Sequence, residues 1–170
     1  MNIFLIGYRC TGKTTVGRAL AQRLGAEFVD ADDYLVEKAG KTIKRIFAED
    51  GEQAFRDLEE RCISELAARS NVVVAAGGGA VLRRANVDAM RASGTVVLLE
   101  ADAATIYSRI TGDPKTDSQR PSLTGKPQYD EIVHLLEYRK PFYAAAAHLA
   151  FDSAQTPPKE LVERIIKAIR

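Results

Sequence analysis

The sequence predicts an α/β protein, a three-layer α/β/α sandwich built on a five-stranded parallel sheet. Short β-branched apolar runs alternate along the chain with longer segments of helical period, which is the pattern of β-α-β units. Several of these runs are continuously apolar, as expected of strands that helices cover on both faces. The 170 residues, 46% of them hydrophobic, can build one core, so we expect a single domain spanning residues 1–170.

Each expected strand is a short and largely apolar run, and the segments between the strands carry apolar residues at helical spacing. We place the strands at residues 3–6, 27–30, 72–75, 96–100 and 148–152. The first helix begins near Lys13, because Val16, Leu20 and Leu24 recur every four residues and Gly25 follows as a C-terminal cap. Further helices are expected from about Tyr34 and at residues 42–48, 52–69, 83–92, 103–110, 130–143 and 158–170.

Residues 111–127 carry no apolar period and contain three prolines and two glycines. A connection of this length without regular structure is uncommon inside a compact domain and is usually a binding loop or a lid. We therefore expect a mobile lid at about 111–127.

Composition excludes several classes of function. The formal charge is only +1, which removes the case for a nucleic-acid binder. Cys10 and Cys62 lack the spacing of a zinc site or a disulfide framework, which favours a reducing cytoplasm. The N-terminus does not read as a signal peptide, and the longest uncharged run, residues 72–82, is shorter than the ~20 residues that span a bilayer. We expect a soluble protein with no membrane partner.

Residues 7–14 fit the pattern G-x-x-x-x-G-K-[ST] between the first strand and the first helix. Gly7 and Gly12 let backbone amides turn toward phosphate oxygens, Lys13 reaches the terminal phosphates, and Thr14 ligates Mg²⁺. A glycine-rich turn would match by accident in roughly 0.6% of chains of this length. The motif therefore predicts binding of a nucleoside triphosphate.

Two carboxylates, Asp30 and Asp32, follow the second strand at the sheet edge where ligands bind. If the chain is still extended there, both side chains point to one side. Asp30 would then lie near Mg²⁺, and Asp32 would serve as the general base for a substrate hydroxyl. The alternative is a polar turn in which Asp33 caps the following helix.

Three arginines are candidates for binding an anion. Arg139 lies within the apolar stripe of its helix, where a guanidinium needs a carboxylate or phosphate partner unless it extends to solvent from the stripe edge. Arg56 reads from spacing alone as a solvated pair with Glu59 or Glu60. Arg120, in the expected lid, could reach a transferring phosphate or be an ordinary exposed loop residue.

A glycine triplet, residues 77–79, follows the third strand at its carboxyl end. Backbone without side chains lets a ligand approach closely, although a flexible turn would use the same residues. His134 and His148 sit in an expected helix and strand without an evident metal partner, so we expect both to be structural.

These residues resemble the shikimate kinase family over essentially the whole chain. The resemblance rests on GYRCTGKTTVGRALA, FVDADDYL, IFAEDGEQAFRDLEE, VVAAGGGAVL, QRPSLTGKP and EYRKPFY. It implies a fold of the P-loop, nucleoside-monophosphate-kinase-like type. It also implies transfer of the ATP γ-phosphoryl group to the 3-hydroxyl of shikimate in aromatic amino-acid biosynthesis, by a monomer with Mg²⁺ as cofactor.

The resemblance also implies roles for individual residues. Asp32 resembles the residue that holds the shikimate hydroxyls, and Arg56 and Arg139 resemble the pair that grips its carboxylate. The implied substrate site comprises Asp32, Arg56, Glu59, Gly78, Gly79 and Arg139, with Glu59 supporting Arg56. The implied ATP site comprises Gly7, Cys10, Thr11, Gly12, Lys13, Thr14, Thr15, Arg109, Arg120 and Gln155, and the metal site Thr14 and Asp30. Lys13, Asp32 and Arg120 are the implied catalytic residues.

Two other functions remain open at this point. A related small-molecule kinase, such as a gluconate kinase, would share the phosphate loop, although the phrase Phe55-Arg56-x-x-Glu59 argues against it. A nucleotide-dependent switch protein would also bind a triphosphate, but the sequence has no N-K-x-D phrase for reading guanine.

Overall fold

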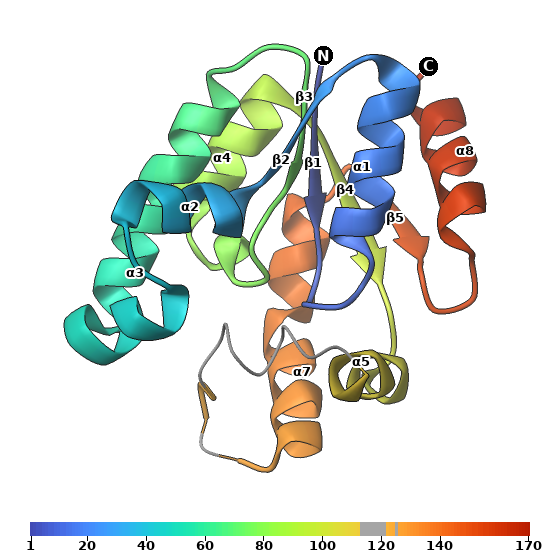
Figure 1. The fold of residues 1–170 in the computed structure, drawn as a ribbon. Coiled ribbons are helices and arrows are strands. Elements are labelled where there is room, and N and C mark those ends of the chain that lie inside the picture. The colour runs from blue at the N-terminus through green and yellow to red at the C-terminus, as the bar shows by residue number, and fades with distance from the viewer. Residues whose placement is uncertain (113–121, 125) are drawn as a thin grey trace.

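The computed structural model describes residues 1–112, 122–124 and 126–170. The described helices and strands lie close to the expected ranges (Figure 1). The strands are β1 Asn2–Ile6, β2 Glu27–Asp30, β3 Val72–Ala75, β4 Gly94–Glu100 and β5 Leu149–Asp152. The α-helices are α1 Lys13–Leu24, α2 Ala31–Ala39, α3 Ile43–Ala67, α4 Arg84–Ser93, α5 Ala103–Thr111, α7 Gln128–Ala146 and α8 Pro158–Ile169, and a short 3₁₀ turn spans Ala80–Leu82.

All five strands are parallel and lie in the order β2-β3-β1-β4-β5, so the predicted five-stranded parallel sheet is confirmed. β1 is central, with β3 on one side and β4 on the other. The chain changes direction across the sheet at this strand, and ligands of open α/β sheets bind at such a switch point. The topology therefore directs attention to the carboxyl end of β1.

Helices cover both faces of the sheet, which gives the predicted three layers (Figure 1). Alternate residues of β1 point to opposite faces. Ile3 and Leu5 pack with apolar residues of α1 and α8, whereas Phe4 and Ile6 pack with those of α3, α4 and α7. Since both faces are buried, the apolar run 3–6 of β1 and the wholly apolar β3 are what such strands require.

The helix α3 is bent where the sequence predicts a break between two helical segments. Gly51 has φ 86° and ψ 170°, a conformation that side chains rarely allow, and the backbone resumes its helical path beyond it. The bend lets the two halves of α3 approach the same site, with Phe47 before it and Arg56 after it, and the Phe47 and Phe55 rings lie 4.8 Å apart.

The junction after β2 corrects one expectation. The chain is not extended beyond Asp30, because α2 begins at Ala31, so Asp30 and Asp32 do not share one side of a strand. The cap of α2 is Asp30 and not Asp33: its carboxylate accepts hydrogen bonds from the backbone N–H groups of Asp32 and Asp33. These bonds satisfy amides that the first helical turn leaves unpaired, so the helix begins directly after β2, at Ala31 and not near Tyr34.

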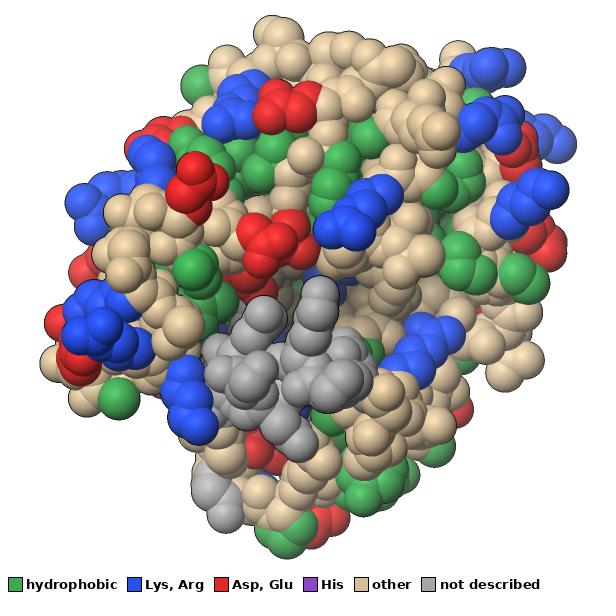
Figure 2. Space-filling model, in the orientation of Figure 1, with side chains coloured by type: hydrophobic (Ala, Val, Ile, Leu, Met, Phe, Trp, Pro, Cys, Tyr) green, Lys and Arg blue, Asp and Glu red, His purple; other side chains and the backbone are tan. Residues whose placement is uncertain are grey.

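The visible face of the molecule carries mixed charges. Lysine, arginine, aspartate and glutamate side chains are interspersed over it (Figure 2), in keeping with the formal charge of +1. Among the described residues, every helix is too short or too polar to pass through a lipid bilayer.

Candidate active site

The phosphate loop joins β1 to α1 at the switch point. Gly7 and Gly12 have φ of 141° and 97°, and Cys10 also has a positive φ of 60°. A Cβ on Gly7 would lie 2.4 Å from the carbonyl oxygen of Leu99, so this position requires glycine. The Nζ of Lys13 donates to the carbonyl oxygens of Gly7 and Tyr8, at 2.7 Å each. The predicted loop is therefore formed, with its lysine folded over it.

Thr14 and Asp30 meet beside this loop. The Thr14 hydroxyl donates to Asp30 Oδ2 at 3.0 Å, which brings the two predicted metal ligands together. Burial, followed by the nearby carboxylates of Asp32 and Asp33, raises the pKa of Asp30 above its usual value. A cation here would relieve that electrostatic cost, and hydroxyl and carboxylate oxygens are donors that Mg²⁺ prefers.

The donor set fits magnesium better than a metal that needs a protein cage. The described residues contain no group of three or more His, Cys, Asp or Glu side chains placed to hold a metal ion. Mg²⁺ keeps several waters and is usually held by one or two protein oxygens together with substrate phosphates. Thr14 and Asp30 could supply those oxygens.

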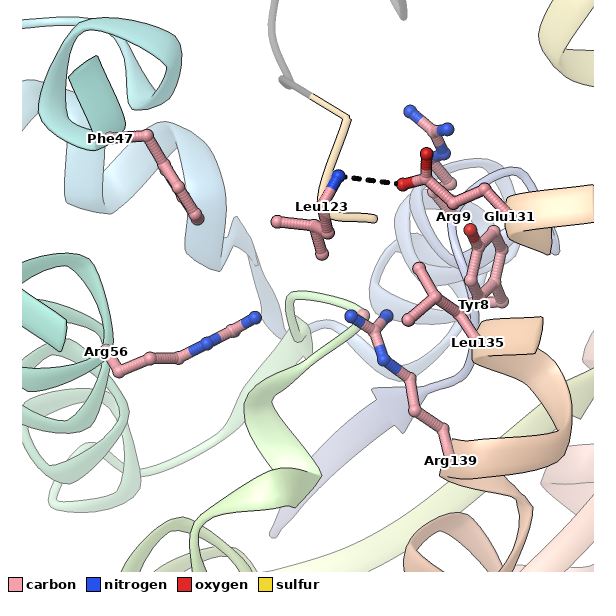
Figure 3. A pocket seen from close by; sticks show the side chains of 9 residues that line it. Tyr8, Arg9, Phe47, Arg56, Leu123, Glu131, Leu135 and Arg139 are labelled. Carbon is pink, nitrogen blue, oxygen red and sulfur yellow. Dashed lines mark hydrogen bonds between the residues drawn. The ribbon is translucent and has the colours of Figure 1, made fainter. Parts of the chain in front are cut away.

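A second pocket lies next to the loop, with arginines on opposite sides. The guanidinium groups of Arg56, from α3, and Arg139, from α7, point toward one another across it (Figure 3). Gly78, from the turn after β3, also lines the pocket. The residues lining this pocket are Tyr8, Arg9, Phe47, Arg56, Gly78, Leu123, Glu131, Leu135 and Arg139. Asp32 is not among them; it stands in the first turn of α2.

Arg56 is buried, so the solvated pair suggested by its spacing is wrong. Arg56 is 6% exposed and Glu59 is 4% exposed, and Arg56 Nη1 donates to Glu59 Oε1 at 2.9 Å. The helix α3 turns this side inward by packing against α2, α4 and the sheet. A guanidinium has five donors, and Glu59 accepts from only part of that fork, so the arginine can still bind an oxyanion.

Arg139 is also buried, at 4% exposure, which excludes a side chain reaching solvent from the stripe edge. Its guanidinium carbon lies 5.6 Å from the centre of the Tyr8 ring, within cation–π range. Its Nε is buried without a hydrogen-bond partner among the described residues. Burying an unpartnered donor of a charged group is costly, which points to a ligand that supplies the acceptor.

The glycines after β3 let both arginines approach the backbone. A Cβ on Gly79 would lie 2.4 Å from Arg56 Nη1, and one on Gly78 would lie 3.2 Å from Arg139 Nη1. The carbonyl oxygen of Gly78 accepts a hydrogen bond of 2.6 Å from the Tyr143 hydroxyl. The turn is thus fixed by α7, and the reading as a merely flexible turn is not supported.

Another pocket also adjoins the phosphate loop. It contains Cys10, Thr11, Gly12, Thr15, Arg109 and Gln155, together with neighbouring residues of the β5–α8 loop. Arg109 donates to the carbonyl oxygens of Cys10, at 3.1 Å, and Ser153, at 2.8 Å. It thereby ties the loop to the segment after β5, and the structure gathers here part of the expected ATP site.

Two expectations have different outcomes. Arg120, and with it most of the expected lid, lies outside the described residues. His148 accepts a hydrogen bond at Nδ1 from the backbone N–H of Val96, at 2.9 Å, which fits the structural role expected of it.

Several pocket residues were missed by the sequence reasoning. Tyr8 and Arg9 lie inside the phosphate motif at positions where the pattern admits any residue. Phe47 and Leu123 belong to the pocket only through tertiary packing. Glu131 had a usable signal: it stands eight residues before Arg139, which places it near the same side of the helix.

Comparison with known proteins gives one consistent result. The family model described as shikimate kinase matches residues 9–170. Shikimate kinase 2 of Sodalis glossinidius (strain morsitans) is 44% identical over 168 residues, covering 99% of this chain and 95% of its own.

Solved structures agree. Shikimate kinase from Acinetobacter baumannii, in complex with shikimate, has a TM-score of 0.91 at 36% identity and covers 99% of this chain and 92% of its own. Shikimate kinase from Bacteroides thetaiotaomicron has a TM-score of 0.89 at 35% identity, covering 99% and 98%. The chain therefore belongs to the shikimate kinase family of ATP-dependent kinases, whose members phosphorylate a hydroxyl of shikimate.

Proposed function

We propose that this chain transfers the γ-phosphoryl group of ATP to the 3-hydroxyl of shikimate, giving shikimate 3-phosphate and ADP. One observation carries the proposal: two buried arginines face one another in a pocket that Gly78 also lines, next to a formed phosphate loop. A small acid and a nucleotide would then lie side by side, as phosphoryl transfer requires.

In this proposal Arg56 and Arg139 bind the substrate carboxylate. Glu59 holds one side of the Arg56 guanidinium, and the Tyr8 ring supports that of Arg139. The remaining donors of both forks, including the buried Nε of Arg139, would bind the acid through charge-assisted hydrogen bonds. Gly78 and Gly79 leave room for the ligand against the backbone.

At the phosphate loop, the backbone from Gly7 to Thr14 and the start of α1 would cradle the ATP phosphates. Lys13 would exchange its bonds to the Gly7 and Tyr8 carbonyls for phosphate oxygens and neutralise charge that develops during transfer. Thr14 and Asp30 would hold Mg²⁺, which neutralises phosphate charge when bound.

Asp32 is proposed to bind the substrate hydroxyls and to accept the proton of the reacting one. The support for it is its place at the start of α2, beside the proposed metal ligand Asp30. The ATP base and sugar would lie against Arg109 and Gln155, in the pocket that also contains Cys10, Thr11, Gly12 and Thr15. The role of Arg120 at the reacting phosphate rests on the family resemblance alone.

The proposal extends to the state of the protein. We propose a monomer that acts in the cytoplasm on shikimate and ATP, without nucleic-acid or membrane partners. The two cysteines support a reducing compartment, because neither Cys10 nor Cys62, both described, is in a disulfide.

The deciding experiment is ADP release from ATP and Mg²⁺ by the purified chain, with shikimate, with gluconate and with neither. Release that depends on shikimate is the expected result. Release with gluconate alone would transfer the chain to a different kinase activity. Binding of ATP without stimulation by either acid would overturn the proposed reaction and favour a nucleotide-dependent switch.

A further inference from the structure

Glu131 is a buried carboxylate that the proposed reaction does not use. It lies in the first turn of α7, is 4% exposed, and lines the pocket that contains Arg56 and Arg139. Its carboxylate accepts two hydrogen bonds, from the Ser122 hydroxyl at 2.6 Å and from the backbone N–H of Leu123 at 2.9 Å (Figure 3 shows the second). Burying a carboxylate is costly unless donors are supplied, and here both donors come from one short segment.

The same segment forms part of the pocket wall. The Leu123 side chain lines the pocket together with Phe47 and Leu135. It also packs on the apolar cluster that Tyr8 and Leu135 form with residues of α5 and α7. Leu123 is therefore held at two points, through its amide by Glu131 and through its side chain by this cluster.

We propose that Glu131 is a positioning residue, which fixes Ser122 and Leu123 so that Leu123 forms a wall of the acid-binding pocket. This inference rests on the proposed function, because the wall matters only if the pocket binds the acid substrate. Glu131 makes no contact with the reacting groups in this role. It acts through the Leu123 backbone, and its loss should weaken shikimate binding more than ATP binding.

Four variants of the full chain test the proposal. Glu131→Ala removes both hydrogen bonds. Glu131→Gln can restore them, since the amide oxygen accepts from the Leu123 N–H and the amide nitrogen donates to the Ser122 hydroxyl. Ser122→Ala removes the first of these two bonds to Glu131 and leaves the one from the Leu123 N–H. Asp130→Ala is the matched control, because Asp130 is an exposed acid in the same helical turn and its side chain makes no hydrogen bond or ion pair with the described residues.

The first measurement is hydrogen exchange at the Leu123 amide, followed by NMR without any substrate. Exchange should become faster in Glu131→Ala, stay near the wild-type rate in Glu131→Gln, and be unchanged in Asp130→Ala. Unchanged exchange in Glu131→Ala would show that the carboxylate does not fix the segment. This measurement does not depend on catalysis, so it tests whether Glu131 fixes the Leu123 segment even in a chain that does not phosphorylate shikimate. Failure of the wild-type chain to phosphorylate shikimate would overturn the proposed function instead.

The second measurement is steady-state kinetics on both substrates. We expect KM for shikimate to rise about ten-fold in Glu131→Ala and about three-fold in Ser122→Ala, with KM for ATP within about two-fold of wild type. Glu131→Gln should recover most of the loss. Equal rises in KM for both substrates, or faster exchange at Leu123 with no change in KM, would overturn the positioning role. If Glu131→Ala does not fold, Ser122→Ala decides between the same outcomes.

Discussion

The phosphate loop and the arginine pocket lie side by side at the same edge of the sheet, yet they are assembled in different ways. The loop is one continuous segment whose shape is set by Gly7 and Gly12 and by Lys13 folding back on its own carbonyls. The pocket takes its walls from segments far apart in the sequence, with Arg56 on α3, Gly78 after β3 and Arg139 on α7. A local motif therefore forms the first site, and tertiary packing forms the second.

The largest expected effect comes from the loop. Lys13→Met should lower kcat about 100- to 1,000-fold, because it removes a charge placed against the phosphates without emptying the core. Binding of shikimate without nucleotide should stay close to wild type. ADP release and shikimate titration measure the two quantities, and Lys159→Met, an exposed lysine of α8, is the control. Turnover at the wild-type rate in Lys13→Met would contradict the catalytic role proposed for the loop.

The opposite pattern is expected in the pocket. Arg139→Ala should raise the dissociation constant of shikimate about 10- to 150-fold, the equivalent of about 1.5–3 kcal/mol, because it deletes charge-assisted hydrogen bonds. ATP binding should remain nearly unchanged, as calorimetric titration of each ligand can establish. Arg164→Ala, on exposed surface of α8, is the control. Equal losses of affinity for shikimate and ATP would show that Arg139 does not bind shikimate specifically.

A smaller effect is expected at the bend of α3. Gly51→Ala should lower the free energy of unfolding by about 1–3 kcal/mol, because φ 86° and ψ 170° are essentially restricted to glycine. Among the described residues no atom lies within 4 Å of the added Cβ, so backbone strain is the cause.

The control for Gly51→Ala is Gly40→Ala, which ends α2 at φ 69° with equally open space. Gly40→Ala should lower the free energy of unfolding by about 1–2 kcal/mol. Urea denaturation measures both. Only Gly51→Ala should also raise KM for shikimate, since only that bend brings Phe47 and Arg56 to one pocket. A rise in both variants would indicate general loosening of the fold.

The smallest effect concerns pH and leaves both sites untouched. Partial desolvation of this largely exposed ring, followed by the charge of Arg91, lowers the pKa of His148 below its ordinary value of 6.5. The unfolded chain therefore takes up this proton first as the pH falls below 6.5, so stability declines there and levels off below the folded-state pKa. Denaturation midpoints should show a shallow decline that His148→Gln removes. An unchanged decline in that variant would assign it to other groups.

The sequence predicts the sheet and the phosphate loop well because their determinants are local. The apolar runs locate the strands within one or two residues, and the glycine-lysine motif carries its own geometry. The spacing of Arg56 and Glu59 correctly pairs them but misjudges their exposure, since burial depends on how α3 packs. The prediction for the junction after β2 is wrong for a related reason. Three aspartates stand where α2 begins, and only the packing of the fold makes Asp30 the residue that caps the helix.

One side of α7 links several of these features. Four residues of this helix follow one another at four-residue intervals: Glu131, Leu135, Arg139 and Tyr143. Glu131 binds the Leu123 N–H, and Leu135 lines the arginine pocket. Arg139 lies over the Tyr8 ring, and Tyr143 donates to the Gly78 carbonyl. Four residues advance a helix by roughly 400°, so neighbours in this row differ by only about 40° in direction. A small rotation of the helix about its axis would therefore displace all four contacts together. The arginine pocket should respond to such a rotation as a unit, whereas the phosphate loop, attached to β1 and α1, keeps its shape.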